Sequence, residues 1–589
     1  MIVLGINETH CATAAILRDG RVIGCASEER FTRLKNDAGY PRRAIDALLG
    51  ELGLSRSDID LVALAGARAA AREWLNRVLH DEAYAREYYG VRWPSQQRAM
   101  ARRMRKLGAK VGLIDASRGK FGISQDDRLA AITAHLAIPP SRIICVDHHS
   151  CHAAAAYYGA GWHAHGERPA LVLTNDNSGD GLCATASIGS GRELVRREAS
   201  RSAPGSLGAF YSFATLLLGM KFGEHEYKLM GLAPYALDEP ARRAEEALRE
   251  VFELDEGQPA SFRWRKPGER YPLLLRATLG LRFDAVAGGA QRLLEDLLLR
   301  WSRLMHRRYG GGRVALGGGV FMNVKANRRL AEEPWIEDLF AFPSCGDESN
   351  AVGAAYLGYL EEAARRGVRA APEPFGPAYL GPSVTDDEAE AVIRERRLAG
   401  TYAISYCDRV EERIAELLVS DGVVARCAGR MEFGARALGN RSILANPSDP
   451  RVVPIINSMI KNRDFWMPFA PTVLAERADD YLVNPKRLAS PYMMLAMATT
   501  PAAQTALAAA IHPRDHTARP QILEETWNPG YHAVISAFQR RTGVGAVLNT
   551  SFNLHGEPIV CTAADAVDTF ERSGLPHLAV GHWLISKKG

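Results

Sequence analysis

Short runs of β-branched and aliphatic residues, each followed by a segment with helical periodicity, constrain the fold of the first part of the chain most strongly. The runs are MIVLGI, LVALAGA, RIICVDHH, ALVLTNDNSGDG and RVALGGGVF. Each run is apolar at consecutive positions, which is typical of strands buried on both faces of a sheet. Each run also ends in small or polar residues, where a strand gives way to a turn. The sequence therefore predicts an α/β fold here.

A segment rich in proline and glycine, RRGVRAAPEPFGPAYLGPS, interrupts the chain near residues 364–384. Its composition is typical of a linker. After it, TYAISYC, GVVARCAG and GVGAVLNTSFN predict strands, while DEAEAVIRERRL and RVEERIAELLV predict amphipathic helices. We expect a first domain over residues 1–365, a linker over 366–384 and a second α/β domain over 385–589. The length of 589 residues agrees, because one hydrophobic core rarely holds so many.

The composition excludes several classes of protein. With 47% apolar and 24% charged residues, the chain is neither disordered nor collagenous. Its nine cysteines are scattered, odd in number and contain no C-x-x-C pair, which argues against a disulfide framework or a zinc ribbon and favours a reducing compartment. The opening MIVLGINETH does not resemble a signal peptide, and no run approaches 18 apolar residues. We therefore expect a soluble cytoplasmic protein without a membrane partner.

One run of positive charge is present, QQRAMARRMRKLGAK, with six Lys or Arg between Arg98 and Lys110 and no acid. It is compatible with a helix that faces RNA or phosphate, and it is also typical of a solvated helix face, because it lacks interleaved aromatic residues. The net charge of +5 is small for this length and neither demands nor excludes a polyanionic partner. The sequence therefore does not favour a nucleic-acid partner.

His148 and His152 follow the predicted strand RIICV, in the segment DHHSCHAAAAYYG, whose alanines favour a helix. Residues at positions i and i+4 lie on one face of a helix, so both imidazoles can reach one ion. Asp147 can cap that helix. Imidazole suits iron or zinc. An equally open alternative is that they are simply polar residues at the end of a strand.

Two carboxylates stand where other predicted strands stop, Asp176 in LVLTNDNSGDG and Asp347 in FPSCGDESNAVGAAYLG. In open α/β sheets ligands gather at the carboxyl ends of strands, so acids there can converge although they are distant in sequence. Each aspartate alone is more typical of a turn. Together with the histidine pair they predict a His2Asp2 site for a divalent transition metal.

Glycine-rich turns follow three of the predicted strands. LGGGVFMN contains Gly317, Gly318 and Gly319, and a glycine triple at a strand end lets the backbone approach a nucleotide with its N–H groups toward phosphate or ribose. Tight turns also use glycine for conformation alone. The segments NSGDG and GINETHCATAAIL supply two more such loops. At the level of fold alone, the three are similar to the loops of the actin, sugar-kinase and Hsp70 fold.

Eight segments, taken in order, resemble the NodU/CmcH family of carbamoyltransferases, which includes enzymes that modify antibiotics. They are SEERFTRLK, DHHSCHAAAAYY, GEHEYKLMGLAPY, LGGGVFMN, GDESNAVGAAYLG, GRMEFGARALGNRSILANP, HTARPQ and LNTSFNLHGEPIV. The ordered combination covers most of the chain and is far more specific than any single motif. It implies an actin-like first domain (ASKHA, a duplicated RNase H-like fold) that holds metal and nucleotide, and a YrdC-like second domain.

The resemblance implies an enzyme that uses ATP with Mg²⁺. The second domain would convert carbamoyl phosphate and ATP to carbamoyl adenylate. The first would pass the carbamoyl group to a hydroxyl, or an amine, of a small natural product, as in antibiotic biosynthesis. Its divalent metal would be iron first, with zinc or manganese as alternatives. A tRNA-modifying carbamoyl-type transferase and a non-catalytic actin-like nucleotide-binding regulator stay open as other functions, and both monomer and homodimer stay open.

The resemblance also assigns residues in the first domain. The metal positions match His148, His152, Asp176 and Asp347. Asp176 is also expected to act in catalysis, and His10 matches a histidine near the acceptor, where its near-neutral pKa suits a base or positioning group. The residues expected to bind the nucleotide are Lys35, Lys228, Gly317, Gly318, Gly319 and Asn323.

Carbamoyl phosphate is a small dianion, and the second domain offers cationic and short polar side chains for it. The expected contacts are Arg436, Lys461, Arg463, Arg519, Asn549 and Ser551. Guanidinium groups bind phosphate in a bidentate manner, and short amides and hydroxyls suit carbamoyl and phosphate oxygens. A salt-bridged surface is the alternative for any single arginine.

Three places depart from the family pattern. Met467 stands in MPFAP where the family has RPFAP, so an arginine expected at the carbamoyl phosphate site is absent. Loss of one buried charge-assisted contact costs about 1.5 to 3 kcal/mol. His516 occupies the usual glycine position of DGTAR. Thr9 and Cys11 flank His10 where the family often has acidic or small residues, and this pair is expected to reshape the acceptor pocket.

Overall fold

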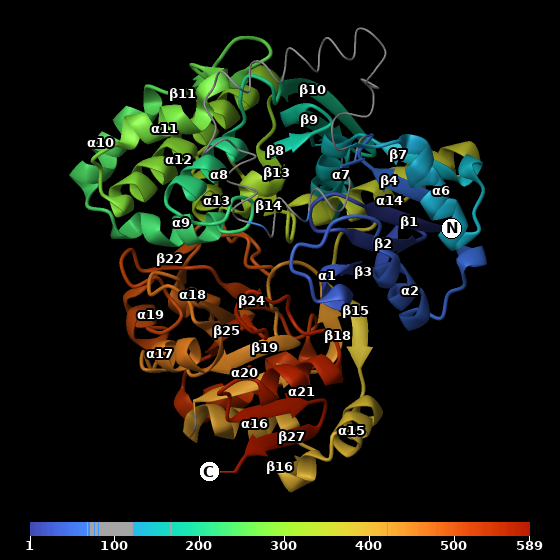
Figure 1. Cartoon of the computed structure of the whole chain (residues 1–589), viewed down its shortest axis with the longest axis vertical. Coiled ribbons are helices and arrows are strands. Elements are labelled where there is room, and N and C mark those ends of the chain that lie inside the picture. Colours follow the sequence, from blue (N-terminus) through green and yellow to red (C-terminus); the bar gives the residue numbers. More distant parts are fainter. Residues whose placement is uncertain are drawn as a thin grey trace. The chain divides into compact units, whose positions relative to one another are not determined.

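The computed structural model describes residues 1–67, 69–70, 76, 81, 122–164, 168–420 and 422–588. The basic run at 98–110 lies outside the described residues. The chain forms two compact units (Figure 1). Unit 1 comprises Met1–Arg21, Asn36–Arg42 and Arg56–Pro374, and unit 2 comprises Val22–Lys35, Arg43–Ser55 and Phe375–Gly589.

Unit 1 contains the same strand arrangement twice. The first sheet has β1 (Ile2–Asn7), β2 (Thr13–Arg18), β4 (Leu61–Ala65) and β7 (Ile143–Val146), and the second has β8 (Ala170–Gly179), β9 (Leu182–Ser190), β10 (Glu193–Arg201), β13 (Arg313–Gly317) and β14 (Asp338–Ala341). The order β2-β1-β4-β7 recurs as β9-β8-β13-β14. In each sheet the first pair is antiparallel and the later pairs are parallel. The predicted duplicated α/β fold is confirmed, and all five predicted runs form strands.

Two helices continue from strands of these sheets. α7 (His148–Ala160) follows β7, and α14 (Asn350–Arg365) follows β14 after a short turn. They pack against each other, and α14 also packs on β1 and β4. The contact is close because Gly353 leaves room: a Cβ there would lie 1.8 Å from the carbonyl oxygen of Cys151. The N-termini of both helices are therefore held at the carboxyl ends of strands.

The remaining elements of unit 1 are mostly helical. They are α6 (Gln125–Leu136), α8 (Leu207–Leu217), α9 (Glu226–Leu232), α10 (Asp238–Arg249), α11 (Arg270–Thr278), α12 (Phe283–Tyr309), α13 (Val324–Ala331) and the short strands β5 (Ala69–Ala70), β6 (Gly122–Ile123), β11 (Phe252–Asp255) and β12 (Ser261–Trp264). The long helix α12 packs against α8, α9 and α10 (Figure 1). Among the described residues, none of the helices combines the length and hydropathy that a membrane crossing requires.

Unit 2 is built on a mixed eight-stranded sheet. Its order is β16-β27-β26-β17-β19-β25-β20-β24, with β16 (Tyr402–Tyr406), β17 (Val423–Cys427), β19 (Arg441–Ala445), β20 (Ala470–Leu474), β24 (Gln521–Leu523), β25 (Ala546–Ser551), β26 (His577–Val580) and β27 (Trp583–Lys587). Residues alternate along its strands between two cores, so that Val423 and Ala425 lie in one and Val424 lies in the other. The predicted α/β class is therefore confirmed for this part.

Helices supply the other half of each core. α16 (Val410–Ser420) and α20 (Pro529–Thr542) pack on one face of the sheet, and α15 (Asp386–Glu395), α17 (Val452–Ile456) and α21 (Ala563–Glu571) pack on the other. The smaller elements are β15 (Tyr379–Val384), β18 (Gly429–Glu432), α18 (Ala478–Tyr481), β21 (Leu482–Val483), β22 (Met497–Thr499), α19 (Pro501–Ala506) and β23 (Thr517–Ala518). The predicted strands and helices of the second domain all form.

A segment near the N-terminus belongs to unit 2. It includes most of β3 (Arg21–Ser27), α1 (Glu29–Thr32) and α2 (Arg42–Glu51). Arg30 donates a hydrogen bond to the carbonyl of Gly434, and Arg33 donates to the carbonyls of Pro558 and Ile559. The chain thus passes between the units within its first 56 residues and again after Pro374. The linker at 366–384 and the two domain boundaries stay predictions.

Candidate metal centre and cationic cluster

The four side chains predicted as metal ligands lie together in unit 1. One ligand atom from each of His148, His152, Asp176 and Asp347 lies within 4.8 Å of the others. His148 Nε2 is 3.1 Å from His152 Nε2, and it is 3.3 and 3.5 Å from carboxylate oxygens of Asp176 and Asp347. His152 Nε2 is 3.6 and 3.7 Å from the same two oxygens. Both imidazoles are buried.

The local fold explains why these residues meet. α7 begins at His148, and Asp147 caps it by accepting a hydrogen bond of 2.8 Å from the Ser150 N–H. His152 follows one turn later on the same face. Asp176 lies on β8, and Asp347 opens the turn that leads into α14. The last part of β8, the start of α7 and the turn before α14 thus place two imidazoles opposite two carboxylates.

A hydrogen-bond chain sets the tautomer of His152. The Ser349 hydroxyl donates its single hydrogen to the carbonyl of Gly346 at 2.8 Å, so its oxygen accepts from His152 Nδ1 at 3.1 Å. A proton on Nδ1 leaves the lone pair of Nε2 directed at the cluster. Burial disfavours the charged imidazole, but the carboxylates of Asp176 and Asp347, 3.6 and 3.7 Å from Nε2, outweigh burial and raise the pKa of His152 to about 9. The two carboxylates therefore draw positive charge to this point.

The spacing of the four donors fits a divalent transition metal. Metal–ligand bonds of about 2.0 to 2.2 Å in a tetrahedral site place the donors roughly 3.3 to 3.6 Å apart. The five distances recorded among these atoms run from 3.1 to 3.7 Å. Two imidazole nitrogens and two carboxylate oxygens form a mixed donor set that iron, zinc and manganese accept.

Residues that the sequence did not single out as site residues support this cluster. Thr9 Oγ1 lies 2.6 Å from Asp347 Oδ2 and donates to that carboxylate. Asn350 Nδ2 lies 3.3 to 3.4 Å from ring nitrogens of His148 and His152. Asn350 follows Asp347 in the motif GDESN, and this nearness in sequence was the available signal. Such outer contacts fix the orientation of ligands.

His149 stands between the two predicted ligands in sequence but takes no part in the cluster. Its Nδ1 lies 2.8 Å from the Thr174 hydroxyl. Burial, followed by the fields of His148 and His152, lowers the pKa of His149 to about 3. The ring is therefore neutral, as expected for a buried structural histidine.

The glycine-rich turn after β13 packs against the cluster. A Cβ at Gly319 would lie 2.9 Å from Asp176 Oδ1, and one at Gly317 would lie 2.7 Å from the carbonyl oxygen of His152. The N–H of Gly318 donates to the carbonyl of Cys345. These glycines are needed for the close approach of two backbones. Their predicted contact with nucleotide stays a prediction.

Asn323 and Lys228, which are predicted to bind the nucleotide, lie at two different helices of unit 1. Asn323 caps α13 by accepting from the Ala326 N–H, and its amide exchanges hydrogen bonds with Gln291. Both of these contacts are with the scaffold. Lys228 lies on α9, two residues after the half-buried Glu226. Their contacts with nucleotide stay predictions.

His10 lies half-buried in the turn between β1 and β2. Burial raises the pKa of Glu226 and of Glu348, and His10 lies within electrostatic reach of both carboxyl groups. The turn also carries Thr9, which contacts Asp347. His10 therefore adjoins Thr9, which contacts the predicted metal ligand Asp347, in the turn where a base for an acceptor is expected.

Replacing Gly179 by alanine is expected to displace His148 and to weaken divalent-metal binding about tenfold or more. A Cβ at this position would lie 2.0 Å from His148 Cδ2. Gly268→Ala is the matched control, because a Cβ there meets nothing within 4 Å. Titration against a metal buffer measures the effect. If both variants bind metal as the parent does, His148 is not a ligand.

A second cluster, here called the cationic cluster, lies in unit 2. It consists of Lys35, Arg436, Lys461, Arg463 and Arg519. Burial lowers the pKa of Arg519 well below its usual range, and the nearby charges of Arg436 and Arg463 lower it further. Burial likewise lowers the pKa of Lys461, with added repulsion from Arg463 and Lys35. The positive side chains of this cluster are therefore close enough to repel one another.

Lys461 is 2% exposed and holds the end of β25. Its ammonium donates to the backbone carbonyl of Ser551, to the Ser551 hydroxyl at 3.1 Å and to Asn553 Oδ1 at 2.7 Å. These acceptors are neutral. Lys461 therefore orients the polar turn SFN while it adds charge to the cationic cluster.

Asn549 fastens the loop that carries Arg436. Its amide donates to the carbonyl of Ala437 and to the Thr472 hydroxyl, both at 3.1 Å. Its Oδ1 is buried and has no hydrogen-bond partner among the described residues. A buried oxygen without a hydrogen-bond partner is suited to accept from the N–H of a bound amide.

The same loop is held at its ends by buried charges. Glu432 accepts hydrogen bonds from the backbone N–H groups of Leu438, Asn440 and Arg441. Arg441 is fully buried and donates to several backbone carbonyls, including those of Cys561 and Ala428. The loop that presents Arg436 is therefore preorganised.

Two of the positions that depart from the family pattern, Met467 and His516, lie in unit 2. Met467 is buried, and the Arg463 guanidinium lies 5.3 Å from the centre of the Phe469 ring. His516 has a φ of 52°. This is the left-handed region, where glycine is the usual residue. His516 thus adopts a backbone conformation that favours glycine.

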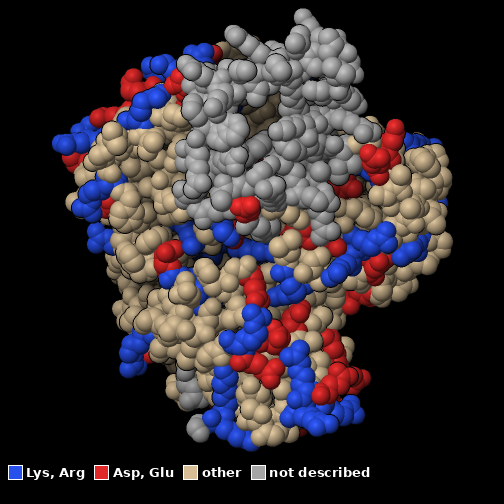
Figure 2. Space-filling model, viewed as in Figure 1, with Lys and Arg blue, Asp and Glu red and all other residues tan. Residues whose placement is uncertain are grey.

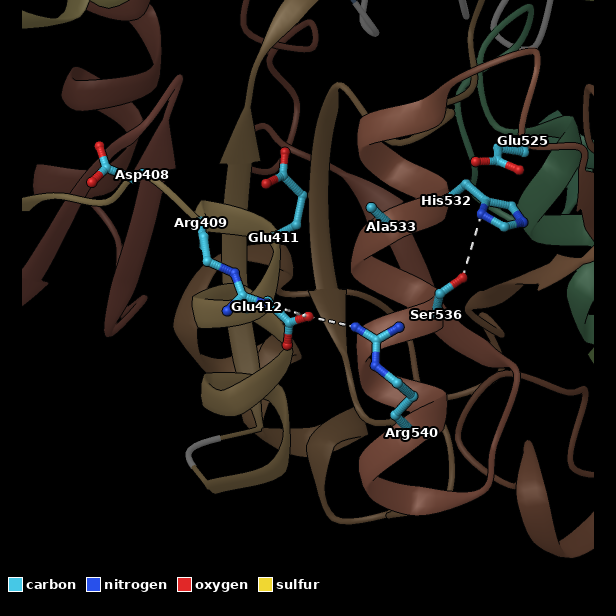
Figure 3. A pocket seen from close by; sticks show the side chains of 9 residues that line it. All are labelled: Asp408, Arg409, Glu411, Glu412, Glu525, His532, Ala533, Ser536 and Arg540. Carbon is cyan, nitrogen blue, oxygen red and sulfur yellow. Dashed lines mark hydrogen bonds and ion pairs between the residues drawn. The ribbon is translucent and has the colours of Figure 1, made fainter.

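A separate surface cavity of about 370 Å³ lies between α16 and α20 (Figure 3). Its charged groups pair with one another, as Arg540 does with Glu412, and His532 contacts Ser536. None of the predicted site residues lines it. Lys and Arg are interspersed with Asp and Glu over the visible described surface (Figure 2), in keeping with the small net charge.

Two family models match the chain. Residues 2–356 match the carbamoyltransferase N-terminus, and residues 415–587 match the carbamoyltransferase C-terminus. The chain belongs to the carbamoyltransferase family. The predicted family is therefore confirmed, and the protein is an enzyme that transfers carbamoyl groups.

Known relatives agree with this assignment. Nodulation protein NolNO of Sinorhizobium fredii is 34% identical over 590 residues, which cover 98% of this chain and 79% of NolNO. Nodulation protein NolO of Bradyrhizobium diazoefficiens is 32% identical over 452 residues, covering 75% and 79%. Among solved structures, full-length HypF in the phosphate- and nucleotide-bound form is 13% identical and covers 62% of this chain and 55% of HypF, with a TM-score of 0.34. The assignment to the carbamoyltransferase family rests on the two family models.

Proposed function

We propose that this carbamoyltransferase works in two steps and uses ATP, with Mg²⁺, and carbamoyl phosphate. The cationic cluster of unit 2 binds carbamoyl phosphate and the phosphates of ATP and forms carbamoyl adenylate. The His2Asp2 cluster of unit 1 holds a divalent metal, with iron first among the candidates. There the carbamoyl group passes to a hydroxyl, or an amine, of a small natural product.

One observation carries the first step: Arg519 is held beside Arg436 and Arg463 although burial and repulsion both disfavour its charge. Such a cluster raises the free energy of the empty protein and becomes favourable when a polyanion binds. Guanidinium groups match phosphate oxygens in a bidentate manner. Carbamoyl phosphate and ATP are both polyanions of this kind.

The neutral groups around the cluster suit the carbamoyl end of the substrate. The buried Asn549 Oδ1 can accept from a carbamoyl N–H, and the Ser551 hydroxyl can donate to an oxygen. Water first cleaves carbamoyl phosphate to carbamate and inorganic phosphate. A carbamate oxygen then bonds to the α-phosphorus of ATP, and the bond from that phosphorus to the bridging oxygen breaks as pyrophosphate leaves. Pyrophosphate release therefore reports this step alone.

In unit 1, His148, His152, Asp176 and Asp347 would hold the metal. Such an ion supplies Lewis-acid polarisation of a carbonyl or phosphate oxygen. The chain's own groups do the rest: Thr9 fixes Asp347, Ser349 fixes the tautomer of His152, and His10 takes the proton of the acceptor. Burial of the imidazoles keeps water from competing for the site.

The test measures pyrophosphate from enzyme, ATP, Mg²⁺ and carbamoyl phosphate, followed by screening of acceptors for the mass gain of one carbamoyl group. Pyrophosphate that depends on carbamoyl phosphate is the expected result. Its absence with metal-loaded enzyme would contradict the adenylation step. Steep salt dependence of RNA binding would instead favour the tRNA-modifying alternative. Membership of an enzyme family opposes the non-catalytic regulator.

A further inference from the structure

The turn between β1 and β2 places a thiol beside an imidazole. Cys11 Sγ lies 3.4 Å from His10 Nδ1 and 4.0 Å from His10 Nε2. On its other side, the protonated thiol donates to Asn36 Oδ1 at 3.5 Å. Cys11 is half-buried, so a small molecule can reach it. A nucleophile within hydrogen-bond reach of a base is the usual arrangement of an activated thiol.

The backbone of this turn is held rigidly. The Asn7 amide donates to the carbonyls of His10 and Cys11, at 3.1 and 3.3 Å. The Thr13 hydroxyl donates to the carbonyl of Cys11 at 2.8 Å. Cys11 itself has a φ of 56°, which non-glycine residues seldom adopt. The sulfur is therefore positioned by the turn and not by a freely moving loop.

The other accessible cysteines lack this arrangement. Three of the nine cysteines are half-buried and six are buried. Of the three, Cys145 Sγ accepts from the Gln125 amide, and burial raises its pKa. Cys407 Sγ lies 3.7 Å from the Ser405 hydroxyl. Within the described residues, Cys11 is the one of these three with a recorded imidazole contact.

The turn also places Cys11 at the expected site of transfer. Thr9, two residues earlier, contacts the predicted ligand Asp347 at 2.6 Å. His10 lies within electrostatic reach of the half-buried Glu226 and the buried Glu348. A thiol here meets whatever carbamoyl donor reaches the His2Asp2 cluster.

We propose that Cys11 is a catalytic nucleophile that carries the carbamoyl group as an S-carbamoyl cysteine, a thiocarbamate, with His10 as its base. The inference rests on the proposed function for its donor, carbamoyl adenylate. His10 takes the thiol proton, sulfur bonds to the carbonyl carbon, and the bond from that carbon to the phosphate oxygen breaks. AMP leaves with the electron pair, and the imidazolium proton passes to water.

The second half returns the enzyme to its first state. His10 takes the proton of the acceptor hydroxyl, whose oxygen bonds to the carbonyl carbon. The carbon–sulfur bond breaks, its electron pair returns to sulfur, and the thiolate recovers the proton from His10. The product is a carbamate ester of the acceptor.

Chemical labelling tests the thiol without any assumption about the donor. Potassium cyanate carbamoylates thiolates, and peptide mass analysis identifies which cysteine reacts. Cys11 is expected to react about tenfold faster than Cys145 or Cys407 in the intact protein, and His10→Asn is expected to remove that advantage. Equal rates at the three cysteines would overturn the activation by His10.

Turnover tests the role of the thiol in catalysis. Enzyme given ATP and carbamoyl phosphate without acceptor is expected to gain one carbamoyl group on the Cys11 peptide. Cys11→Ser is expected to lose this gain and about a hundredfold in transfer rate, yet to keep pyrophosphate release, while Cys407→Ser behaves as the parent.

The outcomes separate the inference from the proposed function. Pyrophosphate release with no labelled Cys11 and undiminished transfer by Cys11→Ser overturns the inference and leaves the function standing. No pyrophosphate from the parent overturns the function, and cyanate labelling then still decides whether His10 activates Cys11.

Discussion

Replacing His152 by alanine is expected to weaken divalent-metal binding by about a hundredfold or more. The change removes one of two nitrogen donors and leaves Asp176 and Asp347 facing His148 alone. It also leaves the Ser349 hydroxyl without its imidazole partner. The measurement is the metal retained per chain after dialysis against a metal buffer, with circular dichroism as the test of folding. Transfer to an acceptor is expected to fail with it, while pyrophosphate release in unit 2 continues.

Two neighbouring variants sharpen this test. Ser349→Ala keeps all four ligands and removes the group that fixes the tautomer of His152, so a loss of about tenfold is expected. His149→Gln changes a buried histidine of the same helix whose ring contacts Thr174, and it is expected to bind metal within about threefold of the parent. If His149→Gln loses as much metal as His152→Ala, the ligand assignment is wrong.

The sequence predicted most of what places this cluster. Buried strands read as continuous apolar runs, and all five runs in the first part of the chain form strands. Helical periodicity put His148 and His152 on one face, and the rule about carboxyl ends of strands put Asp176 and Asp347 near them. These arguments need only the direction of each strand and the spacing at which side chains of a helix or strand return to the same face.

The contacts around the cluster could not be predicted in the same way. Thr9 reaches Asp347 across 338 residues of sequence, and Ser349 orients His152 through its own bond to Gly346. Each contact depends on a rotamer and on a few tenths of an ångström. Spacing alone does not carry that information.

The place of the segment around Lys35 was also hidden in the sequence. The motif SEERFTRLK lies near the N-terminus, yet it packs in unit 2 through Arg30 and Arg33. Both arginines donate to backbone carbonyls. A carbonyl acceptor has no sequence signature. Arg33 also pairs with Glu557 and Asp565, at 3.8 and 4.0 Å, but these acids are too distant in sequence for spacing to pair them. The result brings Lys35 within reach of Lys461.

Replacing Arg519 by methionine is expected to lower the rate of adenylation by two to three orders of magnitude, roughly 3 to 4 kcal/mol in transition-state stabilisation. The guanidinium lies beside Arg436 and Arg463 in the cationic cluster. Methionine keeps a shorter unbranched stem and removes the charge. Arg519→Lys keeps the charge but loses bidentate contact, so an intermediate rate is expected. The measurement is kcat/KM for carbamoyl phosphate, from pyrophosphate release.

The stability of the same variant is expected to change in the opposite direction. Because burial and two like charges disfavour charged Arg519 in the empty protein, Arg519→Met is expected to raise the free energy of unfolding by about 1 kcal/mol without ligand. Carbamoyl phosphate is expected to stabilise the parent but not the variant. Arg540→Met, on the surface of α20 beside Glu412, is the control, with adenylation unchanged. A residue kept for structure alone loses stability when it is replaced, so a less stable Arg519→Met with full adenylation would show that Arg519 braces the fold and binds no anion.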